Sequence, residues 1–266
     1  YLDLTPQDRI VCVLPFFYSY GNSVLHTHLA VGGSVVMQRS MMFPRVVLEQ
    51  IQAERATGFS GVPSTYALLL ARTKIEDFDL SSLRYLTQAG GAMPTAHITK
   101  IRELLPNARL FVMYGQTEAT ARLSYLPPEY LERKLGSVGF GIPGVALEVR
   151  DESRKPVNDM ATGEIWATGA NIMAGYWNDQ ELTVEVLRDG WLRTGDMGHR
   201  DADGFFYIEG RRSDMIKVGA HRINPQDIEE VIAEMEGVAE VAVVGAPDDI
   251  LGQVVRAVVV LREGAA

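Results

Sequence analysis

Short apolar runs alternate with amphipathic stretches over the first 114 residues of the chain. The runs predict strands at residues 9–14, 34–38, 57–62, 83–89 and 108–114. Between them, apolar positions recur at helical spacing and predict helices at residues 22–30, 44–56, 64–72 and 94–105. Strands and helices that alternate in this way predict parallel βαβ units and a doubly wound sheet with helices packed against it.

The pattern changes after Gly115, where strand-like runs are separated by Gly, Pro and Asp. Strands are expected at residues 145–150, 163–168, 196–200 and 205–209, with a hairpin turn at 201–204, and then at 215–218, 239–244 and 254–261, with a helix from Pro225. The expected fold class is α/β: a doubly wound sheet, a β-rich subdomain and the start of a small α+β C-terminal domain. The expected domains are residues 1–212 and 213–266.

Composition narrows the classes of function. The 266 residues include 25 Lys plus Arg and 34 Asp plus Glu, a net charge of −9, which argues against a nucleic-acid binder that relies on neutralising phosphates. No apolar run approaches the roughly 20 residues of a membrane span. The single cysteine, Cys12, lies in an apolar run, so a buried inert thiol and a reducing cytoplasm are expected.

Two features look like binding motifs but lack the necessary context. Residues 139–144 spell G-F-G-I-P-G, yet a strand-like run follows them, whereas a dinucleotide motif opens a helix. A glycine-rich turn is expected there. His26 and His28 are two residues apart on a predicted helix, so they face different sides and are not expected to share a metal.

The strongest chemical signal is the segment Y-G-Q-T-E-A-T at residues 114–120, which follows the apolar strand 108–114. Residues just past a strand's C-terminal end line the ligand crevice of an α/β sheet. The segment offers an aromatic face, a glycine for close backbone approach, a hydroxyl, and a carboxylate suited to a hard cation. The alternative interpretation is a tight loop with a capping threonine and a solvated glutamate.

Further motifs stand in a fixed order along the chain. They are G-G-A-M-P at residues 90–94, W-L-R-T-G-D at 191–196, G-R-R-S-D-M-I-K-V-G at 210–219 and N-P-Q-D-I-E-E at 224–230. Together with residues 114–120, they strongly resemble the adenylate-forming superfamily, which includes acyl-CoA synthetases and adenylation domains. The resemblance extends from Leu14 to about Leu261.

The resemblance implies a nucleotide site. Its residues would be Gly91, Ala92 and Met93 at the adenine, Tyr114 stacked on the ring, Thr117 at the phosphates, Asp196 at the ribose hydroxyls and Arg211 beside the nucleotide. Glu118 would bind Mg²⁺, so Thr117 and Glu118 are the catalytic candidates. The alternative for Asp196 and Arg211 is a surface ion pair.

The same resemblance points to a substrate pocket and a hinge. Tyr18, Gln88 and Gly115 are the pocket candidates, and Ser213 stands at the hinge position. No acidic residue occurs between Cys12 and Leu48, where amino-acid-activating relatives usually carry one. A fatty, aryl or other carboxylic acid is therefore favoured over an α-amino acid.

The activity implied is that of an AMP-forming acid–thiol ligase. ATP and Mg²⁺ would activate the acid as an acyl-adenylate, and CoA or the phosphopantetheine of an acyl carrier protein would accept the acyl group. The upstream phosphate loop and C-terminal lysine of the superfamily are absent, and Lys217 belongs to a different motif. We therefore expect a fragment that is inactive alone. The alternatives are a carrier-loading adenylation domain and a catalytically silent nucleotide-binding module.

Overall fold

The computed structural model of the chain describes residues 1–219, 221–233, 235–248, 251–262 and 264. These residues fall into two compact units, each built from several segments. Unit 1 contains Tyr1–Glu148, Trp166–Thr194 and Arg200–Tyr207, and unit 2 contains Val149–Ile165, Gly195–His199 and Ile208–Ala266. None of the helices in the described ranges is both long and apolar enough to cross a membrane.

The first strands of unit 1 form a parallel sheet. They are β1 (Arg9–Cys12), β2 (Ser34–Met37), β3 (Gly58–Gly61), β4 (Tyr85–Gln88) and β5 (Arg109–Tyr114). Their hydrogen-bonded order is β2-β1-β3-β4-β5, and Ile10 of β1 pairs with both Val35 and Gly58. Each strand falls within a predicted apolar run, so the predicted parallel sheet is confirmed.

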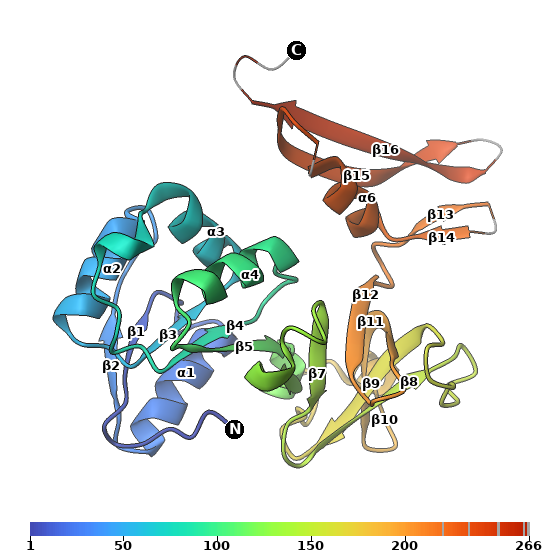
Figure 1. Ribbon diagram of the computed structural model, residues 1–266. Coiled ribbons are helices and arrows are strands. Elements are labelled where there is room, and N and C mark those ends of the chain that lie inside the picture. The colour runs from blue at the N-terminus through green and yellow to red at the C-terminus, as the bar shows by residue number, and fades with distance from the viewer. Residues whose placement is uncertain (220, 234, 249–250, 263, 265–266) are drawn as a thin grey trace. The chain divides into compact units, whose positions relative to one another are not determined.

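Helices cover both faces of this sheet (Figure 1). The helices are α1 (Ser19–Ala30), α2 (Pro44–Ala53), α3 (Pro63–Arg72) and α4 (Thr95–Leu104). Val11 of β1 joins the apolar cluster that contains residues of α2, α3 and α4, whereas Ile10 and Cys12 join the cluster that contains Tyr20 and Val24 of α1. Successive strand residues point to opposite faces, so one strand serves both clusters and the doubly wound arrangement is confirmed.

Beyond β5 the pairing becomes antiparallel. The short 3-10 turn η2 (Thr117–Ala119) leads to β6 (Ser124–Leu126), which pairs with β5. A second 3-10 turn, η3 (Pro128–Tyr130), leads to β7 (Ser137–Gly141), which pairs with β6. The strand β8 (Val145–Arg150) follows β7 directly. No helix follows the glycine-rich residues 139–144, as expected. The predicted turn is shorter than that segment, because residues 139–141 belong to β7 and only residues 142–144 form the turn before β8.

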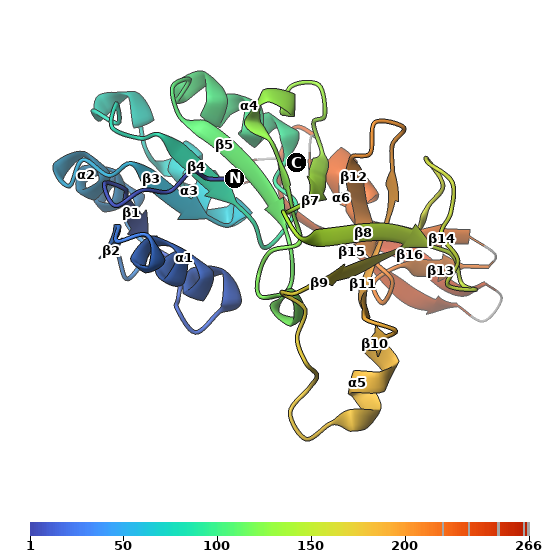
Figure 2. The same ribbon diagram turned by 90° about the horizontal axis from the view of Figure 1, so that it is seen from below.

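The order of hydrogen-bonded strands continues from β7 through β12 (Phe206–Arg211), β11 (Trp191–Arg200) and β9 (Gly163–Gly169) to β8. The short strand β10 (Leu187–Arg188) pairs with β11. The predicted hairpin turn is confirmed, because the Gly204 amide donates to the carbonyl of Asp201 at 3.0 Å. A long connection leads from the end of β9 to α5 (Gln180–Val186) (Figure 2).

The last part of unit 2 is a small sheet with a helix. Its elements are β13 (Ile216–Val218), β14 (His221–Ile223), α6 (Pro225–Ala233), β15 (Val238–Asp248) and β16 (Gly252–Leu261). The strand order is β14-β13-β16-β15, with β15 and β16 antiparallel over most of their length. This arrangement agrees with the predicted small α+β region. The predicted boundary between domains 1–212 and 213–266 stays a prediction.

Candidate functional site

The candidate site in unit 1 is built on the loop that follows β5, residues 115–122, called here the β5 loop. A bond of 2.8 Å from the Leu123 amide to the Tyr114 carbonyl closes it, and η2 forms its centre. A Cβ on Gly115 would lie only 2.1 Å from the carbonyl oxygen of Ala121, so the backbone can close here because residue 115 has no side chain. The loop leaves Thr117 exposed and Glu118 half-buried.

The start of α1 contacts the β5 loop. Ser19 Oγ lies 3.4 Å from Thr117 Oγ1, which brings two hydroxyls together from segments almost a hundred residues apart. Tyr18, the residue before the helix, is exposed, and its ring centroid lies 4.7 Å from that of Phe17. Sequence reasoning selected Tyr18 and Thr117 but missed Ser19. Ser19 could have been selected from its position at the start of a helix that follows a predicted strand.

The turn after β4 carries the predicted adenine contacts. Gly91 and Ala92 are exposed, whereas the side chain of Met93 is buried in the core cluster of α2, α3 and α4. Gln88, at the end of β4, is completely buried, and its Nε2 donates to the Gly91 carbonyl at 2.7 Å. Its Oε1 has no hydrogen-bond partner among the described residues. Gln88 therefore supports the turn, and its predicted part in the substrate pocket is not tested by these contacts.

Glu118 has a partner that the sequence analysis did not select. The Tyr176 hydroxyl donates to Glu118 Oε1 at 2.8 Å. Burial and this hydrogen bond raise the pKa of Tyr176 to about 12, so the phenol is a hydrogen-bond donor at neutral pH. The two residues are 58 positions apart, and a tyrosine in a polar loop carries no local sign of such a contact.

Three predicted residues lie in unit 2. Asp196 is buried on β11, and Arg211 Nε lies 3.1 Å from its Oδ1. The ion pair weighed as the alternative for these residues is thus present, and the ribose role of Asp196 stays a prediction. Arg212 pairs with the buried carboxylate of Glu164 at 3.1 Å. Ser213 is exposed and donates to Asp214 Oδ1 at 2.8 Å.

A hard cation fits at Glu118 together with ligands that a bound nucleotide would supply. Within the described ranges, no three side chains of the types His, Cys, Asp or Glu gather as a metal cage. Mg²⁺ is commonly held by one or two carboxylates together with substrate phosphates and water. Glu118, with the Thr117 hydroxyl beside it in sequence, fits that pattern when the nucleotide supplies phosphate oxygens.

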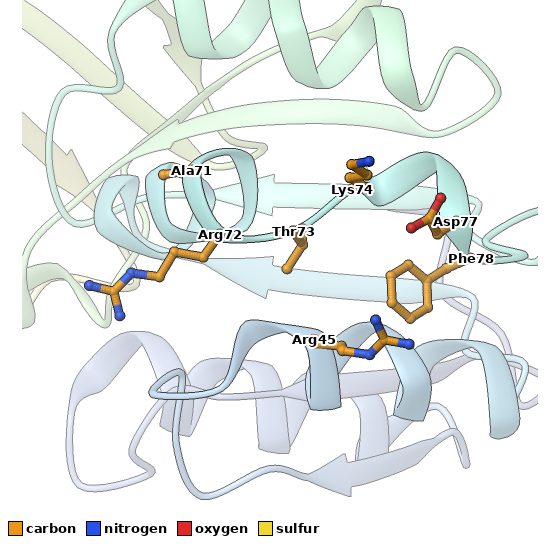
Figure 3. A pocket seen from close by; sticks show the side chains of 7 residues that line it. All are labelled: Arg45, Ala71, Arg72, Thr73, Lys74, Asp77 and Phe78. Carbon is orange, nitrogen blue, oxygen red and sulfur yellow. The ribbon is translucent and has the colours of Figure 1, made fainter.

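A pocket of about 480 Å³ in unit 1 is not part of this site. It is lined by Arg45, Ala71, Arg72, Thr73, Lys74, Asp77 and Phe78 (Figure 3). The Arg45 guanidinium lies 5.5 Å over the Phe78 ring and pairs with Glu49, while Arg72 points away from Phe78. None of the predicted site residues lines this pocket.

Known proteins resemble the chain over nearly its whole length. The indoleacetate–CoA ligase of Aromatoleum aromaticum is 37% identical over 263 residues, which are 98% of this chain and 51% of that protein. The long-chain-fatty-acid–CoA ligase of Bacillus subtilis is 34% identical over 260 residues, 97% of this chain and 46% of that protein. The chain spans about half the length of the curated relatives it matches.

A solved structure has the same fold. The O-succinylbenzoate coenzyme A synthetase of Bacillus subtilis, in complex with ATP and a magnesium ion, matches with a TM-score of 0.87 and 33% identity. The match covers 98% of this chain and 53% of that one. The sequence profile named "AMP-binding enzyme" matches residues 1–177, and that of the "AMP-binding enzyme C-terminal domain" matches residues 227–266. The chain therefore belongs to the AMP-binding enzyme family.

Proposed function

We propose that the protein is an AMP-forming acid–CoA ligase. It activates a carboxylic acid with ATP as an acyl-adenylate and transfers the acyl group to the thiol of CoA. The observation that carries this proposal is the β5 loop, which presents Glu118 and, in contact with Ser19, Thr117 at the carboxyl end of a parallel sheet. The CoA ligases among the similar proteins support the reaction class.

The nucleotide is proposed to bind through the turn after β4, Tyr114 and Asp196. Gly91 and Ala92 offer exposed backbone to the adenine, and the Met93 backbone continues the same turn. Tyr114 stacks on the adenine ring. Asp196 accepts from the ribose hydroxyls, because a carboxylate has two acceptor oxygens and no competing donor.

Charge on the phosphates is the main demand of the first step. Mg²⁺, when bound, offsets that charge. Glu118 holds the cation through a carboxylate oxygen, the Thr117 hydroxyl donates to a phosphate oxygen, and Arg211 contributes a permanent positive charge. These groups position and stabilise the reactants, and no protein nucleophile is required.

The acid is proposed to be fatty or aryl. Tyr18 and Phe17 present exposed rings next to the residue that contacts Thr117, which suits an apolar acyl group. Gly115 lies at the same edge of the sheet, and Gln88 acts through the Gly91 carbonyl. The proposal also includes Ser213 as the hinge between domains 1–212 and 213–266, and a cytoplasmic location that rests on the single buried Cys12.

The test is acid-dependent exchange of pyrophosphate into ATP by the full-length protein, with a panel of aryl, fatty and small acids. Asp196→Asn is expected to raise the KM for ATP by about 10- to 100-fold, because a hydrogen bond to a charged group is worth about 1.5–3 kcal/mol. The melting temperature is measured on the same variant, so that a loss of nucleotide affinity is separated from a loss of stability.

The matched control is Asp77→Asn, which neutralises an acid in the wall of the pocket in Figure 3 and is expected to leave the KM unchanged. Exchange with none of the acids would contradict the proposed reaction. An unchanged KM in Asp196→Asn would contradict the ribose role.

A further inference from the structure

The Tyr176 contact belongs to a segment that holds the β5 loop from one side. This segment, residues 170–176, is called here the brace. The Met173 amide donates to the Glu118 carbonyl at 2.8 Å, which fixes the backbone of the glutamate. The Asn171 side chain donates to the carbonyls of Ala119 and Arg122 at 3.0 and 2.8 Å. The backbone that carries Glu118 is therefore held at several points.

The position of Tyr176 is fixed by the element that follows it. Its amide donates to Thr183 Oγ1 at 2.8 Å, and Thr183 is buried in α5. The Thr183 hydroxyl in turn donates to the carbonyl of Asp179, whose side chain accepts from the Leu182 amide and caps α5. The helix start thus holds the backbone from which the phenol reaches Glu118.

Gly175 is required for this approach. It has φ +151°, and a Cβ there would lie 2.8 Å from a methyl group of Thr183. A side chain at residue 175 would push the brace away from α5 and would move Tyr176 with it. The absence of a side chain at residue 175 therefore helps to keep the Tyr176 phenol within reach of Glu118.

The chemistry of this contact suits a carboxylate that must also bind a cation. The phenol bonds Oε1, and no other residue of the described ranges is seen to hydrogen-bond the Glu118 side chain. A lysine or arginine in place of Tyr176 would cancel the charge of the carboxylate. A neutral donor fixes its orientation and leaves the charge and Oε2 available.

We propose that Tyr176 is a positioning residue that orients the Glu118 carboxylate for a divalent cation bound with the nucleotide. The inference rests on the proposed function, because Glu118 is the cation ligand there. Partners that orient a metal ligand typically contribute about 10- to 100-fold to metal affinity. The loss of the Tyr176 hydroxyl should therefore weaken cation binding and leave the nucleotide contacts in place.

The experiment measures binding of α,β-methylene-ATP in EDTA and at saturating Mg²⁺. The ratio of the two dissociation constants gives the enhancement of nucleotide binding by Mg²⁺. In Tyr176→Phe, the enhancement is expected to fall by about 10-fold, while the dissociation constant in EDTA is unchanged. A purely structural role would weaken binding in EDTA and would leave the enhancement as it was.

Two further variants make the result specific. Tyr207→Phe removes the hydroxyl of another half-buried tyrosine that contacts an acid, Asp201, and is expected to behave as the unmutated protein. Glu118→Gln is expected to lose most of the enhancement.

Full enhancement in Tyr176→Phe with a loss in Glu118→Gln would overturn the role of Tyr176 alone. Full enhancement in both variants would overturn the cation role of Glu118 in the proposed function. Absence of nucleotide binding by the unmutated protein would overturn the proposed nucleotide site and, with it, this inference.

Discussion

At the scale of single residues, His28 shows how a polar side chain is held inside unit 1. It is buried in α1, its Nδ1 lies 2.7 Å from the Val24 carbonyl, and its Nε2 bonds the Tyr85 hydroxyl on β4. A carbonyl can only accept, so Nδ1 carries the proton and Tyr85 donates to Nε2. His28 is thus a neutral link between helix and strand.

This arrangement predicts a pH dependence of stability. Burial lowers the pKa of His28 below its ordinary value, although the Val24 carbonyl and the charge of Asp8 act in the opposite direction. Below about pH 6.5 the unfolded chain takes up a proton that the folded chain does not, so the free energy of unfolding falls as the pH drops.

Replacing His28 by glutamine should remove this loss, which is at most about 1.4 kcal/mol per pH unit. Urea unfolding at pH 7.5 and 5.5 measures the change in the free energy of unfolding between the two pH values. The control is His26→Gln, at an exposed position of the same helix, which should keep the dependence of the unmutated protein. Equal pH dependence of stability in both variants would refute the assignment of this dependence to His28.

At the scale of elements, the β5 loop depends on the absence of a side chain at Gly115. In Gly115→Ala, the new Cβ would collide with the Ala121 backbone, so the loop must open. We expect a loss of about 1–3 kcal/mol in the free energy of unfolding. Displacement of Thr117 and Glu118 should weaken binding of the Mg²⁺–nucleotide complex by about 100-fold, because catalytic and binding groups tolerate little misplacement.

Isothermal titration with α,β-methylene-ATP and urea unfolding measure the two effects. Gly136→Ala is the matched control, because Gly136 has φ +83° but no atom within 4 Å of an added Cβ. It should cost stability through backbone strain of about 1–2 kcal/mol and leave nucleotide affinity unchanged. Tight binding by Gly115→Ala would show that the close approach is dispensable.

The elements also show what the sequence can and cannot predict. Strands β1 to β5 were predicted from apolar runs, which are typical of parallel strands buried by helices. Strand β2 at the sheet edge has such a run although Ser34 and Met37 are exposed. The short antiparallel β6 was missed, since its three residues show no period. The helix α5 was missed too, although Asp179 before Gln180 and Glu181 is a capping signal.

The candidate site likewise contains residues that the sequence could predict and contacts that it could not. Thr117, Glu118 and Asp196 stand in motifs and could be selected from the sequence. The supporting contacts of Gln88 and Tyr176 could not, because hydrogen bonds across a fold leave no periodic pattern. Their partners became identifiable only when the strands and the brace were in place.

At the scale of the whole molecule, the two sheets differ in how much of their surface they bury. Ile10 and Val11 of β1 are 0% exposed, whereas Val258 and Val260 of β16 are 54% and 50% exposed. The small sheet nevertheless has a long antiparallel ladder between β15 and β16. Ile216, Val238, Val243 and Ala246 of the small sheet are buried, so its apolar core is smaller than that of the large sheet.

Hydrogen exchange followed by mass spectrometry should separate the sheets. Peptides of β15 and β16 are expected to exchange at least about 10-fold faster than those of β1, β3 and β4, because little apolar burial opposes local opening. The strands of both sheets are joined by backbone hydrogen bonds, so a lack of such bonds would not explain a difference in exchange rate. Equal protection of the two sheets would contradict the inference that lower apolar burial makes the small sheet open more often.

The pair of Asp196 and Arg211 has a consequence for how such a protein can change by mutation. Asp196 is buried, whereas the Arg211 side chain is 57% exposed. Loss of the arginine leaves a buried negative charge without this ion pair, whereas loss of the aspartate leaves a cation that water can solvate. As far as this ion pair is concerned, substitutions at the two positions therefore have unequal costs. A lineage that loses the aspartate first no longer needs the arginine to compensate a buried charge, so the arginine can then vary.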